Sequence, residues 1–303
     1  MSSNSLSRAA WTEFWSTQIS DDGQLGCLQG SSDNLTKQLG QFWKDWAKAL
    51  PRGGRLLDLA TGNGFVIKQI LSVRRDLKAT GVDYSDRLPP APRNAKLRCG
   101  IAMENLPFPS ARFDAVTSQF GLEYGLMDEA LAEVARVLRP GGRLATIVHL
   151  PDGPLVKHNA ERAKSLAWTM DEERLLERAT AAAAIGEIGT VARLIETVGN
   201  AALRQFGDGS AAAELCQAVA RCLPLLNQPN SAFSRAVLVI ERQAKFESNR
   251  IAALLGAANK VVSAEAMEEL FSMHNFERVE RVLIEAVPGH GAYAAMISAK
   301  RPM

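Results

Sequence analysis

The stretch Arg55-Leu-Leu-Asp-Leu-Ala-Thr-Gly-Asn-Gly64 decides the fold, because an apolar run changes there into a turn with two glycines. The three leucines of the run are typical of a strand that is covered on both faces. Gly62 and Gly64 permit backbone angles and a close ligand approach that a Cβ would obstruct. A helical pattern starts at Phe65, so the turn lies at a helix N-terminus, where backbone N–H groups are unpaired.

An acidic residue closes the next apolar run, since Asp83 stands nineteen residues beyond Gly64. A carboxylate at the tip of the strand beside such a turn can bind the hydroxyls of a ribose. A dinucleotide or a triphosphate fits poorly. Ile67 stands where the Rossmann fingerprint has its third glycine, no Gly-Lys-Ser/Thr follows the turn, and the Asp58 carboxylate would repel a phosphate. A nucleoside that carries a positive charge fits better.

Four motifs follow one another in the order of a known family. They are Asp58-Leu-Ala-Thr-Gly-Asn-Gly64, Gly81-Val-Asp-Tyr-Ser85, Glu104-Asn-Leu-Pro-Phe-Pro109 with Phe113-Asp-Ala-Val116, and Ala135-Arg-Val-Leu-Arg-Pro-Gly-Gly142. Together they resemble the class I S-adenosylmethionine-dependent methyltransferases, and most of all the branch of ubiquinone and menaquinone C-methyltransferases and small-molecule methyltransferases. The resemblance is strong over residues 54–150 and loose over about 276–300.

This resemblance implies a binding site for the cofactor S-adenosylmethionine. The residues expected to line it are Asp58, Ala60, Gly62 and Gly64 at the methionine end, Asp83 at the ribose diol, Tyr84 against the adenine, and Gln119 after the fourth strand. The implied reaction is methyl transfer to the oxygen, nitrogen or carbon of a small-molecule acceptor.

Two departures from the family pattern bear on this site. Ala60 replaces a glycine that is common in the turn, a small change that backbone packing should tolerate. The acid that often accepts from the adenine amino group is missing, because Ala102 and Met103 stand before Glu104. Backbone groups around Ala102 and Met103 are expected to take over, with Met103 packing on the ring.

Composition narrows the class of protein. The 303 residues are 47% hydrophobic and carry a net charge of +2, so the chain can bury a large core and shows no basic footprint for nucleic acid. The first eight residues lack the apolar stretch of a signal peptide, and no run of eighteen apolar residues occurs, which predicts a cytoplasmic protein without a membrane span. The four cysteines have no Cys-x-x-Cys spacing, so no metal site is expected.

The chain divides into four predicted segments. Residues 1–53 form a tryptophan-rich helical cap, 54–150 the cofactor-binding core, 151–275 an inserted helical block, and 276–303 the closing strands. The fold class is α/β, a Rossmann-like and mostly parallel sheet with an antiparallel closing hairpin. Aromatic residues of the cap, Phe14 and Trp15 among them, either contact ligand or pack in the core. The helical block is either a lid that selects the substrate or a packing module that supports a homodimer.

Local signals set some boundaries. Predicted strands cover 55–60, 78–83, 96–101, 113–118 and 142–149, followed by a hairpin of 278–287 and 293–300. Three prolines between Asp86 and Asn94 predict a connection without a regular helix. Asp128 is predicted to cap the helix that runs through Leu138, and Pro140-Gly-Gly142 is predicted to end it.

No catalytic residue is assigned from the sequence. Methyl transfer from a sulfonium needs mainly alignment and exclusion of water, so a general base is optional. His149, at the end of the fifth strand, is the first candidate base, but a histidine there can simply hydrogen-bond a loop carbonyl, and that structural reading is favoured. Glu123 and Tyr124 could orient an acceptor or lie in a surface loop, and the remaining histidines are expected to be solvated or structural: His158, His274 and His290.

The sequence leaves three other functions open. The chain could bind the cofactor without catalysis and serve as a regulatory protein. It could methylate RNA or protein, which the near-neutral charge disfavours. It could also be a dehydrogenase on a related sheet, which Ile67 in place of the third glycine disfavours.

Overall fold

The computed structural model describes residues 11–15, 33–228, 231–285 and 291–303. It divides into two compact units, each described by itself below. The sheet unit takes in residues 1–156 and 256–303, and the helical unit takes in residues 157–255, which lie within the predicted helical block. The boundaries fall inside the helices α5 (Pro154–Ala167) and α9 (Ala232–Val261).

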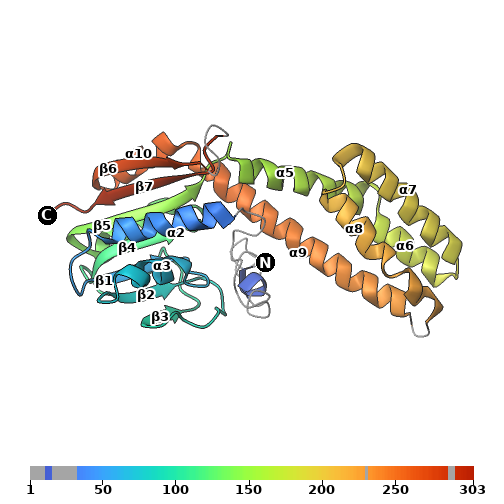
Figure 1. Cartoon of the computed structure of the whole chain (residues 1–303), viewed down its shortest axis with the longest axis horizontal. Coiled ribbons are helices and arrows are strands. Elements are labelled where there is room, and N and C mark those ends of the chain that lie inside the picture. Colours follow the sequence, from blue (N-terminus) through green and yellow to red (C-terminus); the bar gives the residue numbers. More distant parts are fainter. Residues whose placement is uncertain (1–10, 16–32, 229–230, 286–290) are drawn as a thin grey trace. The chain divides into compact units, whose positions relative to one another are not determined.

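A seven-stranded sheet forms the centre of the described sheet unit, in the order β3-β2-β1-β4-β5-β7-β6 (Figure 1). Its strands are β1 (Arg55–Leu59), β2 (Lys78–Val82), β3 (Ala95–Arg98), β4 (Phe113–Gln119), β5 (Leu138–His149), β6 (Glu277–Ile284) and β7 (Ala294–Lys300). Strands β1 to β5 pair in parallel, whereas β7 runs antiparallel to both β5 and β6. This arrangement confirms the predicted fold class.

Helices cover both faces of this sheet. On one face α2 (Asp33–Ala47) and α3 (Phe65–Val73) pack against the strands, and on the other α4 (Met127–Val137) and α10 (Ala264–Met273) do so. In α2 the buried residues Leu35, Leu39, Trp43 and Trp46 recur at helical spacing and point to the sheet. Burial from both sides explains why β1 is an almost continuous apolar run.

Two predicted boundaries are wrong. Helix α4 begins at Met127 after Leu126, no side chain caps it, and Asp128 lies inside its first turn, where a negative charge still favours the helix dipole. The helix ends at Val137, before the predicted stop, and β5 begins at Leu138 and runs through Pro140-Gly-Gly142. Gly141 has φ +71°, which only glycine adopts readily, and the pairing of β5 with β4 is irregular here.

The connection between β2 and β3 contains no helix or strand, as the three prolines predict. Gly64, at the start of α3, lies against it, because a Cβ at Gly64 would come within 2.7 Å of Pro92 Cγ. A proline ring therefore fixes the distance between this connection and the glycine turn.

The helical unit is built from alanine-rich helices, as the sequence predicts. Between its segments of α5 and α9 lie η3 (Trp168–Glu172), α6 (Leu175–Ala184), α7 (Ile188–Phe206), α8 (Ala211–Ala220) and η4 (Leu223–Asn227). They enclose a core of their own, to which Leu175, Val191 and Phe233 contribute fully buried or nearly buried side chains. Ser210 caps α8 by accepting a hydrogen bond from the Ala213 N–H.

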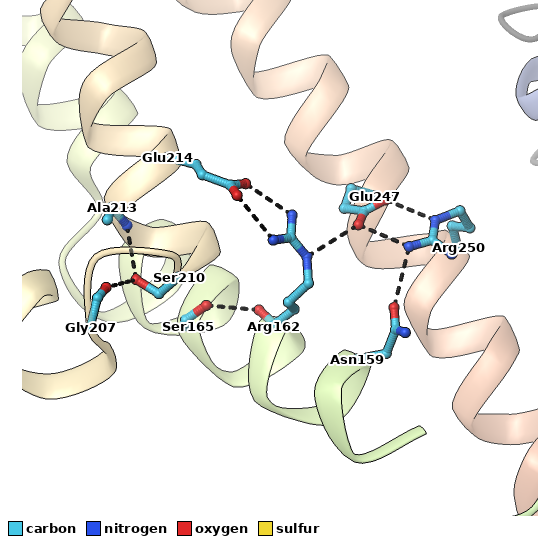
Figure 2. A network of polar contacts seen from close by, with 9 residues as sticks. All are labelled: Asn159, Arg162, Ser165, Gly207, Ser210, Ala213, Glu214, Glu247 and Arg250. Carbon is cyan, nitrogen blue, oxygen red and sulfur yellow. Dashed lines mark hydrogen bonds and ion pairs between the residues drawn. The ribbon is translucent and has the colours of Figure 1, made fainter. Parts of the chain in front are cut away.

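A polar network ties α5, α8 and α9 together within the helical unit (Figure 2). The Arg162 guanidinium donates to both carboxylate oxygens of Glu214, at 3.2 and 3.0 Å, and its Nε lies 3.6 Å from Glu247. Arg250 in turn donates to Glu247 and to the Asn159 side chain. Glu214 beside Arg162 raises the pKa of the guanidinium, so the contact stays charged.

Arg162→Ala is expected to lower the free energy of unfolding by about 1 to 2 kcal/mol. The variant loses the bidentate contact with Glu214, and the loss stays moderate because Glu214 is exposed and solvent screens its charge. Urea unfolding followed by circular dichroism measures the change. The matched control is Arg174→Ala, which removes an exposed pair with Glu177 one helical turn away and should cost less than about 0.5 kcal/mol. Equal losses in the two variants would contradict a role for the network.

Candidate cofactor site

The turn after β1 has the left-handed backbone that its glycines suggest. Gly62 and Gly64 have φ values of +52° and +72°, and Ala60 also adopts a positive φ of +49°. Ala60 thus occupies a conformation that favours glycine, at a cost of about 1 to 2 kcal/mol for a residue with a Cβ. Its methyl group faces the turn after β4, where a Cβ at Gly121 would lie 2.4 Å from the Ala60 Cβ.

The short helix of residues 11–15 lies over this turn. A Cβ at Gly62 would come within 2.2 Å of Trp15 Cζ2, so the indole ring touches the backbone where only hydrogen is present. Trp15 and Phe14 are both buried and meet edge to face, with ring centroids 4.9 Å apart. A hydrogen bond from the Asp86 N–H to the Thr12 hydroxyl, at 2.9 Å, holds the same helix to the end of β2.

Asp83, directly after β2, is joined to the glycine turn. Its Oδ2 accepts from the Gly62 N–H at 2.9 Å, and its Oδ1 accepts from the N–H and the hydroxyl of Ser85 at 3.0 and 2.8 Å. Burial raises the pKa of this carboxyl, while these donors act in the opposite direction. Each carboxylate oxygen has about two acceptor positions, and of the three hydrogen bonds above only that from the Gly62 N–H reaches Oδ2, so Oδ2 is the oxygen that could accept from a ligand.

Asp58 lies inside the sheet, on the strand next to Asp83. The hydroxyls of Thr61 and Thr117 donate to its two oxygens at 2.6 and 2.7 Å. Burial raises the pKa of Asp58 to about 7; the two hydroxyls oppose that rise, and the nearby Asp83 adds to it. The group is therefore poised to ionise near neutrality, and a cation would favour its charged form.

Asp58 and Asp83 are both hydrogen-bonded to the same turn, so two carboxyl groups set the electrostatic character of this place. Neither Asp58 nor Asp83 forms an ion pair with a basic side chain among the residues that the structure describes. Buried charge without a counter-ion is costly, so a ligand that brings positive charge would relieve it. The same pair would oppose a phosphate.

The other predicted cofactor residues end or follow the strands β2, β3 and β4, and they differ in how they are connected to one another. Half-buried Tyr84 stands between Asp83 and Ser85. Ala102 and Met103 are half-buried in the loop after β3, which the Ile101 N–H joins to the Asp83 carbonyl at 2.9 Å. Gln119 ends β4, and its side-chain oxygen accepts from Trp43 Nε1 at 2.7 Å, so it is held from α2 rather than from the turn.

The histidines differ in their burial and in their contacts. His149 is buried at the end of β5, and its Nδ1 lies 2.8 Å from Glu123 Oε1. Glu123 is buried in η2 (Leu122–Tyr124) rather than in a surface loop. His158 is exposed on α5. His274 Nε2 lies 3.0 Å from Asp128 Oδ1, beside α4 and α10. His290 falls outside the described residues.

Several residues of the site are not evident from the sequence. Thr117 holds Asp58, but only the parallel register that sets Asp58 opposite Thr117 reveals this. Ser85 and Thr61 stand inside the family motifs, and a hydroxyl two or three residues from an acid is a usable signal for a local hydrogen bond. Trp43 reaches Gln119 from 76 residues away, and nothing local signals that contact.

With this geometry in place, comparison with known proteins identifies the domain. Residues 57–146 match the family model described as "Methyltransferase domain". The sheet order, the glycine turn and this match together show a class I S-adenosylmethionine-dependent methyltransferase domain, which confirms the resemblance.

Relatives of the chain carry related names. It is 38% identical over 103 residues to the ubiquinone/menaquinone biosynthesis C-methyltransferase UbiE of Geobacter sulfurreducens, a match that covers 30% of this chain and 40% of that protein. With the UbiE protein of Dinoroseobacter shibae it shares 32% identity over 163 residues, covering 45% and 64% of the two chains. The chain thus spans only part of the length of the curated relatives that it matches.

A solved structure also resembles the chain. The 1,6-didemethyltoxoflavin-N1-methyltransferase of Burkholderia thailandensis covers 100% of this chain and 92% of its own, at 12% sequence identity and a TM-score of 0.49. This likeness is too weak to bear on function.

Two features of the described residues concern metal ions and membranes. No group of three or more His, Cys, Asp or Glu side chains is placed there to hold a metal ion. Within the same ranges, no helix combines the length and the apolar character that crossing a membrane requires.

Proposed function

We propose that this chain transfers the methyl group of S-adenosylmethionine to a small-molecule acceptor. The observation that carries the proposal is the pair of buried acids, Asp58 and Asp83, which are hydrogen-bonded to a single glycine turn at the carboxyl ends of β1 and β2. In open parallel sheets ligands bind at this edge. The sulfonium and the ammonium group of S-adenosylmethionine supply the positive charge that the pair lacks.

In this proposal the cofactor lies along the turn. Asp58, Ala60, Gly62 and Gly64 line its methionine end, and the spare acceptor position of Asp83 takes a ribose hydroxyl. Tyr84, Ala102 and Met103 surround the adenine, and Gln119 closes the site from β4. S-adenosylmethionine brings a good leaving group on sulfur, so the protein contributes alignment and exclusion of water, which can supply about 7 to 11 kcal/mol.

The acceptor is proposed only as a small molecule. The two UbiE relatives are named for ubiquinone and menaquinone biosynthesis, but the chain spans at most 64% of their length. For the helical unit, the alternatives of a lid and a dimerisation module both stand as proposals, since its core is self-contained.

Calorimetry with S-adenosylmethionine and S-adenosylhomocysteine tests the cofactor, and mass spectrometry of metabolites after incubation tests the reaction through a gain of about fourteen daltons, the mass of the transferred CH₂. Binding of a nicotinamide cofactor in place of both ligands would contradict the proposal. Cofactor binding without any methylated product would favour the regulatory alternative.

Asp83→Ala is expected to weaken the binding of S-adenosylhomocysteine by about 1 to 3 kcal/mol, because a desolvated ribose hydroxyl loses its acceptor. The matched control is Asp114→Ala, which removes a carboxylate that also accepts from a backbone N–H, that of Arg55 at 2.7 Å, at the opposite ends of the strands. Calorimetry on both variants gives the difference. Unchanged affinity in Asp83→Ala would refute the ribose assignment.

A further inference from the structure

Glu123 is a buried carboxylate with one oxygen in use. Its side chain is 0% exposed in η2, directly after β4. Oε1 accepts from the backbone N–H of His149 at 3.0 Å and lies 2.8 Å from the imidazole Nδ1. Oε2 is buried and has no hydrogen-bond partner in the part of the chain that the structure describes. A buried carboxylate oxygen without a donor is costly, so it calls for a proton donor that is not yet in place.

The contacts of His149 fix the direction of its ring. The Phe120 ring stacks on the imidazole, with centroids 4.3 Å apart and planes 28° apart, and Tyr124 meets it edge on at 6.2 Å. Because Nδ1 faces the Glu123 carboxylate, Nδ1 carries the proton of the neutral ring, and Nε2 keeps its lone pair. Nε2 makes no hydrogen bond to the described residues.

This pair belongs to the same edge of the sheet as the cofactor turn. Strands β4 and β5 are parallel neighbours, so their carboxyl ends lie side by side. Glu123 follows the carboxyl end of β4, and His149 is the last residue of β5. The helix of residues 11–15 contacts both places: Trp11 meets Tyr124 at 5.1 Å between centroids, and Trp15 lies on Gly62. An acceptor near His149 would therefore lie between aromatic rings and close to the cofactor.

We propose that His149 is the general base of the methyl transfer and that Glu123 positions it, so that the enzyme acts on acceptors whose reacting atom carries a proton, an O–H or N–H group on a flat ring. This inference rests on the proposed function and adds the acceptor chemistry to it. Acceptors that attack without losing a proton, such as tertiary amines, would not need this pair.

The step balances without another reactant. The acceptor proton passes to His149 Nε2 while the freed electron pair of the acceptor atom attacks the methyl carbon. The bond between that carbon and sulfur breaks, its electrons stay on sulfur, and the positive charge of the sulfonium is replaced by that of the imidazolium. The Glu123 carboxylate stabilises the imidazolium across the 2.8 Å contact, as a carboxylate does for the histidine of other acid–base pairs. A general base of this kind contributes about 10²- to 10⁴-fold to the rate.

The tautomer of His149 tests the pair without any acceptor. In protein labelled with ¹⁵N-histidine and saturated with S-adenosylhomocysteine, long-range ¹H–¹⁵N correlations should show His149 with a protonated Nδ1 and a bare Nε2, with its signals assigned by their loss in His149→Gln. In Glu123→Leu, which offers Nδ1 no acceptor, the Nδ1–H form should no longer dominate. A protonated Nε2 in the native protein would overturn the proposal, whatever the cofactor measurements give.

Kinetics supply the second test, with the acceptor that the metabolite screen returns. His149→Gln and Glu123→Gln should each lower kcat, the former by about 10²-fold or more, with the affinity for S-adenosylhomocysteine unchanged in calorimetry. The matched control is His274→Asn, which breaks a histidine–carboxylate pair away from the site and should leave kcat unchanged. A native kcat in His149→Gln would overturn the pair, whereas failure of all variants and of the native protein to bind cofactor would overturn the proposed function instead.

Discussion

Trp43→Ala is expected to lower the free energy of unfolding by about 3 to 5 kcal/mol, the range for deleting a large buried aromatic side chain. Trp43 is 0% exposed in the C-terminal half of α2, and its ring meets Phe42 and Trp46 edge to face, with centroids 6.0 Å apart in both pairs. Its Nε1 also donates to Gln119 Oε1 at 2.7 Å. The substitution therefore opens a cavity and leaves the Gln119 amide without its donor.

Trp43→Phe separates these two effects. Phenylalanine keeps one six-membered aromatic ring in the core and lacks the indole N–H, so the expected cost from the hydrogen bond is about 1 kcal/mol, with a cavity cost smaller than that of alanine added. Urea unfolding followed by circular dichroism measures both variants. A loss below about 1 kcal/mol in Trp43→Ala would contradict the central place given to this side chain in the core.

The affinity for S-adenosylhomocysteine is expected to rise with pH up to about 7 and to level off above it. The pKa of Asp58 is raised to about 7 by burial, so the carboxyl is protonated and neutral below that value. The ammonium group of the ligand favours the ionised form, and binding at lower pH must first release the proton. Linkage sets the slope, which can reach about tenfold in the dissociation constant per pH unit below the pKa.

Asp58→Asn should abolish this pH dependence and leave a uniformly weaker site. The control is Asp76→Asn: Arg74 beside it holds the pKa of the Asp76 carboxyl well below its usual range, so that acid is ionised throughout and its removal should not change the slope. Calorimetry between about pH 5.5 and 8 spans the titration of a group near 7. A pH profile that is flat in the native protein would show that Asp58 is not part of the cofactor site.

The sequence predicted the parts of the molecule whose signals are local. The apolar run of β1, its glycine turn and Asp83 all stand within one short segment, and the sheet that they indicated is confirmed by the strand pairing. The alternation of strands and helices likewise predicted the parallel core, and strand-like residue alternation on both sides of a glycine turn predicted the antiparallel closing hairpin.

Signals that depend on distant contacts were missed or misread. The start of α4 is one example, because the Leu126 N–H donates to Glu104 Oε1 at 2.8 Å and so fixes the chain ahead of the helix, where Asp128 cannot cap it. The pairing of Glu123 with His149 is another, since 26 residues separate them and only the adjacency of β4 and β5 brings them together. Both contacts are set by the tertiary fold, and no local pattern encodes them.

The contact between Ala60 and Gly121 makes two separate turns depend on each other. Gly121 has a negative φ of −141°, so its backbone alone does not demand glycine. What excludes a side chain there is the methyl group of Ala60, which would lie 2.4 Å from a new Cβ. A side chain at position 121 therefore requires that the methyl group at position 60 be removed, so the two positions cannot be substituted independently.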